Sequence, residues 1–195
     1  MILGFEASRL RQGVGIDRYV SGLGRTLARD PRIEHLVLID PSPGAEDFLG
    51  EGVPTESRRL RMRRRRLGGL LQRRLVADLD LLHFPVTDAL AWRGVPQVVT
   101  YHGSAPLAFP QMHFSSDAER ARHEAFLRWV FARATLIDVY SRFALEDTAA
   151  RFPEFAKKLR LATPGIEPVF LAEAGPDDDA RLADLGLEPG YVLFV

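Results

Sequence analysis

A histidine at the end of a short apolar segment is the first residue that could carry chemistry. His102 directly follows Gln97–Tyr101, which is rich in β-branched residues and lies between Pro96 and Gly103. This composition predicts a short buried strand. Ligands of open parallel sheets bind outside the carboxyl ends of the strands, so we expect His102 to face a cleft. The alternative is a histidine that only caps its strand or bonds a neighbouring loop.

Two glycines near the N-terminus form a second candidate site. Gly13 and Gly15 precede a predicted helix, and glycines beside a helix N-terminus let an anion approach the backbone N–H groups. A dinucleotide-binding fingerprint would need a third glycine where Arg18 stands, although Asp40 ends the next strand, where a ribose-binding acid would lie. A nicotinamide-dependent oxidoreductase and a flexible loop without a ligand are therefore alternatives.

An arginine-rich segment could bind an anionic partner. Nine arginines and no acidic residue occur from Arg58 to Arg74. Leucines recur on one face of Arg58–Val76, which predicts a basic helix that could contact an anionic membrane surface or an anionic substrate. A solvated face is the alternative. We expect no nucleic acid as partner, because the segment lacks interleaved aromatic residues and the chain has a formal net charge of +0.

The remaining histidines do not favour a metal site. His83 ends a third predicted strand, at 80–85, but no Asp or Glu lies at ligand spacing near it or near His102. We expect no metal and no cofactor. His113 and His123 are expected at the surface.

Composition is that of an ordinary globular protein. The 195 residues are 46% hydrophobic and include no cysteine, which excludes disulfides and thiolate metal sites and fits a reducing compartment. The apolar stretch at the N-terminus is too short for a signal peptide, because a charged residue follows after five positions. No apolar run in the chain reaches the length needed to cross a bilayer. We expect a cytoplasmic protein that associates with a membrane only through the arginine-rich segment.

Hydrophobic patterns predict alternating strands and helices. Strands are predicted at 1–7, 35–39, 80–85, 97–101, 136–140, 159–162 and 191–195. Besides the basic helix, helices are predicted at 16–29, 117–134 and 141–152, loops at 45–57 and 105–116, and an acidic linker with a short helix at 177–187. This alternation is typical of an α/β domain with a doubly wound, mainly parallel sheet flanked by helices.

Six stretches together resemble a known family. Residues 13–19, Gly-Val-Gly-Ile-Asp-Arg-Tyr, resemble the glycine loop and first helix of the retaining GT-B glycosyltransferases that use nucleotide-diphospho-sugars, the group similar to glycosyltransferase family 4. Residues 81–85 resemble its third-strand motif, and 98–103 resemble the strand that carries an active-site histidine. The other similar stretches are 134–147, 161–170 at the crossing into the second domain, and 191–195 at that domain's first strand.

The resemblance implies a Rossmann-like acceptor-side domain over 1–170, the N-terminal half of a GT-B architecture, and a linker with the first strand of a donor-binding domain over 171–195. It implies sugar transfer, with retention of configuration and without a metal, from a nucleotide-diphospho-sugar to a carbohydrate or lipid-linked acceptor. His102 would be the catalytic residue. Further site residues implied are the phosphate or acceptor loop with Gly13, Val14, Gly15, Arg18 and Tyr19, the cleft-lining His83, Gly103, Ser141 and Arg142, and the interdomain hinge Pro164 and Gly165.

Three positions depart from the family pattern. Asp17 stands where glycine is common, Gly103 stands where an acid often follows the histidine, and Tyr140 begins Tyr-Ser-Arg in place of Val-Ser-Glu. The chain ends where the donor-binding domain would begin, so we expect these 195 residues alone to be inactive and to bind nucleotide sugars poorly. A non-catalytic module that docks on a membrane or partner through the arginine-rich segment is the second hypothesis.

Overall fold

A computed structural model describes residues 1–11, 13, 15–49, 55–60, 69–166, 171, 175 and 177–187. The chain divides into two compact units, Met1–Pro164 and Gly165–Val195. The division falls between Pro164 and Gly165, the two residues predicted to form a hinge, and the hinge itself stays a prediction. In the second unit, α7 covers Asp178–Asp184. The strand predicted at 191–195 lies outside the described residues.

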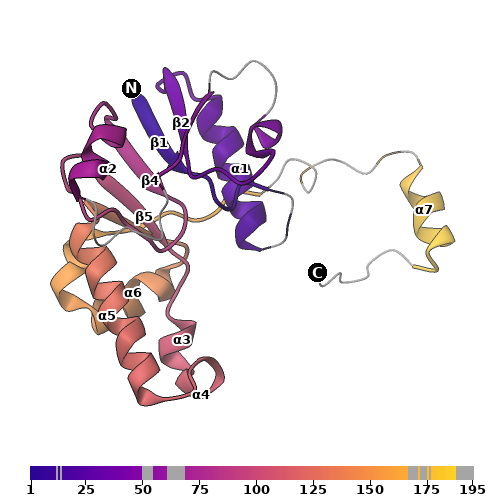
Figure 1. Cartoon of the computed structure of the whole chain (residues 1–195). Helices are drawn as coiled ribbons and strands as arrows, with labels where there is room; N and C mark the ends of the chain where they lie inside the picture. Colours follow the sequence, from indigo (N-terminus) through magenta and orange to yellow (C-terminus); the bar gives the residue numbers. More distant parts are fainter. Residues whose placement is uncertain are drawn as a thin grey trace. The chain divides into compact units, whose positions relative to one another are not determined.

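A parallel sheet of seven strands forms the centre of the first unit (Figure 1). The strands follow the order β3-β2-β1-β4-β5-β6-β7, so the direction of chain progress reverses between β1 and β4. This order confirms the predicted Rossmann-like, doubly wound α/β fold. The strands are β1 Ile2–Glu6, β2 His35–Ile39, β3 Thr55–Arg58, β4 Leu81–Phe84, β5 Gln97–Tyr101, β6 Leu136–Val139 and β7 Leu159–Leu161.

Both faces of the sheet are covered, as expected for a parallel sheet. In β2, Leu36 and Leu38 pack in one core with Val20 of α1, whereas Val37 and Ile39 pack in the other with α2 and α5. Figure 1 shows α1 on one side of the strands, and α2 and α5 on the other. The helical elements of this unit are α1 Ile16–Ala28, η1 Ala45–Phe48, α2 Gly69–Val76, α3 Ala105–Ala108, α4 Pro110–His113, α5 Asp117–Arg133, α6 Arg142–Arg151 and η3 Pro153–Lys158.

Local sequence explains where the longer helices begin. Ser116 and Ser141 are extended N-cap residues whose hydroxyls accept hydrogen bonds from the backbone N–H of Glu119 and Ala144. Two short helices, α3 and α4, occupy the range predicted as a loop at 105–116, and each has a proline in its first turn. The loop prediction was therefore wrong in this range. None of the described helices is both long and apolar enough to span a bilayer.

The predicted basic helix is wrong at its start. Arg58 ends the edge strand β3, and α2 begins only at Gly69. The loop predicted at 45–57 was also wrong at both ends, where η1 and β3 lie. The Arg58 guanidinium lies 2.7 Å from Asp78 and 2.8 Å from Glu56, and it donates to the carbonyl of Leu75 at 2.9 Å. Arg58 is therefore part of an ion-pair network that stabilises the sheet edge. Residues 61–68, with the arginines at their centre, lie outside the described residues.

Gln97 ties the connection between β4 and β5 to the sheet. Its side chain is 1% exposed, accepts a hydrogen bond from the N–H of Leu90 at 2.8 Å, and donates one to the carbonyl of Trp92 at 2.8 Å. This connection begins at Pro85. A single buried amide therefore shapes a loop that leaves the carboxyl end of β4.

We predict that Gln97→Leu lowers the free energy of unfolding by about 3 kcal/mol, because the N–H of Leu90 and the carbonyl of Trp92 lose their partners in a buried place. Urea denaturation measures the change. Gln111→Leu is the control, since Gln111 is exposed on α4 and its replacement should change stability by less than about 0.5 kcal/mol. Equal stability of the two variants would contradict the importance of this tie.

Candidate functional site

The parallel register brings the carboxyl ends of three strands together. Phe84 of β4 pairs with Val99 of β5, and Tyr101 of β5 pairs with Val139 of β6. The residues that follow these strands therefore leave the same edge of the sheet side by side. Two of them, His102 and Tyr140, are in contact there.

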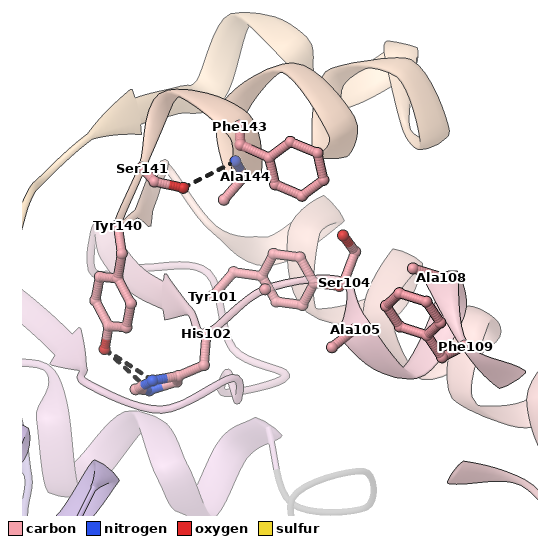
Figure 2. A pocket seen from close by; sticks show the side chains of 11 residues that line it. Tyr101, His102, Ser104, Ala105, Ala108, Phe109, Tyr140, Ser141, Phe143 and Ala144 are labelled. Carbon is pink, nitrogen blue, oxygen red and sulfur yellow. Dashed lines mark hydrogen bonds between the residues drawn. The ribbon is translucent and has the colours of Figure 1, made fainter. Parts of the chain in front are cut away.

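His102 has a hydrogen-bond partner on each ring nitrogen. Nε2 lies 2.8 Å from the carbonyl oxygen of Pro85, and since a carbonyl only accepts, Nε2 carries the proton. Burial lowers the pKa of His102 below its ordinary 6.5, and the bond to Pro85 opposes part of that shift. The neutral ring therefore accepts at Nδ1, where the hydroxyl of Tyr140 donates at 2.8 Å (Figure 2).

Tyr19 completes an aromatic triad, Tyr19–His102–Tyr140. Ring centroids lie 5.7 Å apart for Tyr19 and His102, 4.9 Å for Tyr19 and Tyr140, and 5.0 Å for His102 and Tyr140. Burial raises the pKa of both tyrosines, so their hydroxyls stay protonated at neutral pH. Tyr19 comes from α1. The triad thus joins the helix after the glycine loop to the ends of β5 and β6.

The glycine loop is packed against α1 through Asp17. A Cβ atom at Gly13 would lie 2.6 Å from the carboxylate of Asp17, so only glycine fits there without a shift. The same carboxylate accepts from Arg11 Nε at 2.8 Å and lies 3.3 Å from the guanidinium of Arg9. Gly15 has φ +57° and open space around it. These contacts explain the glycines structurally, and anion binding by this loop stays a prediction.

Two predicted residues of the glycine loop remain. Arg18 is exposed on the first turn of α1. Val14 lies outside the described residues. Among the described residues, no group of three or more His, Cys, Asp or Glu side chains is arranged to hold a metal ion.

A pocket of about 300 Å³ lies beside the triad, between α3 and the start of α6 (Figure 2). Three predicted site residues line it: His102, Gly103 and Ser141. Arg142 is exposed on the first turn of α6, next in sequence to two lining residues. The full lining consists of Tyr101, His102, Gly103, Ser104, Ala105, Ala108, Phe109, Tyr140, Ser141, Phe143 and Ala144.

The two walls of the pocket are joined by hydrogen bonds. Gly103 has φ +113°, a conformation that favours glycine, and it turns the chain from β5 into α3. The hydroxyl of Ser104 donates to Asp147 of α6, and Asp147 is held in turn by Arg151 at 3.0 Å. This tie positions α3 against α6.

His83 lies in the interior of the sheet and outside that pocket. It belongs to β4, its Nε2 is 3.2 Å from the hydroxyl of Thr100, and its ring meets Phe5 edge-on at 5.9 Å. Burial lowers the pKa of His83 to about 4. His83 is therefore a neutral imidazole packed within the sheet, and its predicted cleft-lining role stays a prediction.

Sequence reasoning missed most of the residues that line the pocket, among them Tyr140, Phe109 and Phe143. Tyr140 was noted only as a departure from a family pattern, and Phe109 and Phe143 were not singled out. The position of Tyr140 at the carboxyl end of a strand predicted at 136–140, close to the corresponding position of His102, was a signal that could have identified it. The two phenylalanines carry no comparable signal, because their exposure is known only from the structure.

We predict that Tyr140→Phe raises the pKa of His102 toward 6.5, because a donor on Nδ1 favours the neutral ring. An NMR titration of the imidazole signals measures this. Tyr101→Phe is the matched control, since the buried Tyr101 hydroxyl has no hydrogen-bond partner among the described residues. An unchanged pKa of His102 in Tyr140→Phe would show that the tyrosine does not control the ring.

We predict that stability falls as the pH drops below about 6.5, because the unfolded chain then protonates His83 whereas the folded chain resists until about pH 4. The lowered folded pKa gives a loss of about 2 kcal/mol between about pH 7.5 and pH 5 from this residue alone. Urea denaturation at several pH values tests it. The free energy of unfolding of His83→Gln should depend less on pH than that of the unchanged protein. Parallel plots of unfolding free energy against pH for the two proteins would refute the assignment to His83.

Comparisons with known proteins agree with this geometry. The family model described as Glycosyltransferase Family 4 matches residues 14–170. A crystal structure of Anabaena Alr3699/HepE in complex with UDP-glucose has a TM-score of 0.55 and 14% identity, covering 95% of this chain and 49% of that one. The HepE complex with UDP has a TM-score of 0.58 and 14% identity, covering 95% and 50%. No curated protein matches.

At this level of identity the HepE structures show the fold alone, and this chain spans about half of their length. The family match covers most of the chain and includes the α1 helix, His102 and Tyr140. The chain belongs to Glycosyltransferase Family 4 and has the Rossmann-like fold of an N-terminal GT-B domain.

Proposed function

We propose that this domain binds the acceptor in an enzyme that transfers a sugar from a nucleotide-diphospho-sugar with retention of configuration. The observation that carries the proposal is that His102 lines a pocket at the carboxyl edge of the sheet. Family membership supports sugar transfer. The HepE structures, whose titles name UDP-glucose and UDP, support a nucleotide sugar as donor.

His102 would orient the acceptor rather than remove its proton. Its pKa is lowered, and its single accepting nitrogen already receives the Tyr140 hydroxyl. A neutral ring held at both nitrogens presents a fixed dipole and a fixed face to the pocket. Such positioning can lower a barrier because the reacting groups need less reorganisation. Stabilisation of the departing diphosphate would come from cations on the donor-binding side, with no metal.

The nicotinamide alternative loses support from the surroundings of Asp40. This residue has φ +50°, and its carboxylate accepts the backbone N–H of Leu60 at 2.6 Å. The acid that would bind a ribose therefore anchors the chain that follows β3. Together with the family match, this favours a transferase over an oxidoreductase.

Membrane association through the arginine-rich segment stays a prediction. Arg73 and Arg74 are exposed on α2, but Arg58 is bound within the fold. A cytoplasmic location belongs to the same proposal, since the absence of cysteine fits a reducing compartment.

We predict that His102→Ala lowers the turnover number about 100-fold, the scale for removal of one positioned polar group. Stability should change by less than about 2 kcal/mol, because the side chain is only partly buried. The natural protein that carries this sequence is assayed with a panel of nucleotide sugars that includes UDP-glucose, and NMR determines the anomeric configuration of the product. His113→Ala, at an exposed position on α4, is the control.

Three outcomes would count against this function. Near-normal turnover of His102→Ala would remove the role of the histidine. Inverted configuration in the product would remove the retaining mechanism. A protein that transfers no sugar from any donor of the panel would exclude the proposed activity.

A further inference from the structure

The pocket beside His102 has two chemically different parts. One part carries polar groups, from Tyr140 and Ser141 before α6 and from Ser104 before α3. The apolar part, which we call the mouth because its two phenylalanines are exposed, is formed by Phe109, Phe143 and the alanine side chains at 105, 108 and 144. Figure 2 shows Phe109 and Phe143 on two different elements, with Phe109 and the His102–Tyr140 pair at opposite sides of the view.

The two phenylalanines at the mouth are unusually exposed. Phe143 is 74% exposed and Phe109 is 53% exposed, although both lie against a pocket. Exposed large apolar side chains that gather at one place mark a site where another apolar group binds. Burial of such rings by a ligand is favoured by the hydrophobic effect and by ring contacts.

The chemistry of the mouth favours an apolar group over a free sugar. The side chains of alanine and phenylalanine can neither donate nor accept hydrogen bonds. A sugar ring can stack one face on a phenylalanine, but its hydroxyl groups gain no partner from these side chains. An alkyl chain or an aromatic ring has no such groups, and it gains from leaving water at this place. We therefore expect the apolar part of a ligand at the mouth.

The polar part, in contrast, suits a hydroxyl group. Ser141 is exposed, and its Oγ accepts the N–H of Ala144 at 3.1 Å, which leaves its own O–H able to donate. The hydroxyl of Tyr140 is already bonded to His102 and to Tyr19, so Ser141, beside the Tyr140 ring, supplies the donor for a ligand hydroxyl. The volume of about 300 Å³ is at the lower end for small-molecule sites, so the ligand is small.

We infer that this pocket binds an amphiphilic acceptor, with its hydroxyl-bearing end against Tyr140 and Ser141 and an apolar aglycone between Phe109 and Phe143. The inference rests on the proposed function only in naming the ligand an acceptor. The chemical class is a small alkyl or aryl alcohol or glycoside, rather than a free sugar.

The test compares two probes that differ only in the apolar part, phenyl β-glucoside and glucose. Each is titrated by NMR into the natural protein that carries this sequence, without a donor. Phenyl β-glucoside should bind at least about tenfold more tightly than glucose. Phe109→Ala and Phe143→Ala should each weaken its binding about fivefold, the scale of one lost ring contact. Equal binding of the two probes, or no binding of phenyl β-glucoside at millimolar concentration, would overturn the inference.

Met112→Ala is the matched control. Met112 is 76% exposed on α4, close in sequence to Phe109, but it does not line the pocket. It should leave probe binding unchanged. The same variants are sedimented with phosphatidylcholine vesicles, because exposed apolar residues can also insert into a lipid surface. Vesicle binding weakened equally in all three variants, with probe binding unaffected, would assign these side chains to a membrane and overturn the inference.

The binding experiment separates the two proposals. If phenyl β-glucoside binds as expected and the protein transfers no sugar, the pocket chemistry is right and the proposed activity is wrong. If sugar is transferred while the phenylalanine variants bind the probe normally, the activity stands and the apolar aglycone is excluded.

Discussion

A carbonyl oxygen can only accept a hydrogen bond, and the arrangement of the candidate site depends on this constraint. The carbonyl of Pro85 fixes the proton of His102 on Nε2, so Nδ1 must accept, and Tyr140 must donate to it. Because Tyr140 is held in this way, its ring also contacts Tyr19 of α1. One imidazole therefore links the ends of three strands to the helix that follows the glycine loop.

Sequence patterns predicted six of the seven strands and missed one edge strand. Most residues of β1, β2, β4 and β5 are buried, so these strands form short runs that stand out. The other edge strand, β7, was predicted at 159–162 and covers Leu159–Leu161. The edge strand β3 reads Thr-Glu-Ser-Arg, and within the described part of the chain it pairs with β2 alone, so it carries no hydrophobic signal. The leucine spacing after Arg58 suggested a helix, but the ion pairs of Arg58 with Asp78 and Glu56 are tertiary contacts that periodicity cannot show.

The candidate site could be predicted as separate residues but not as a contact. His102 and Tyr19 were identified from two different motifs, and only the folding of α1 beside the ends of β5 and β6 brings them together. His83 looks similar in sequence, yet it lies within its strand and packs on Phe5, so its environment differs from that of His102. The pocket depends on the tie between Ser104 and Asp147, which are distant in sequence.

The contact of Asp17 with the glycine loop has a consequence for binding thermodynamics. The carboxylate pairs with Arg9 and Arg11, and it lies where a Cβ atom at position 13 would be. Side chains that are fixed within the fold lose little conformational entropy when a ligand binds beside them. Glycine in place of Asp17 would remove this anchor for both arginines, so a ligand bound there would have to order them at the expense of affinity.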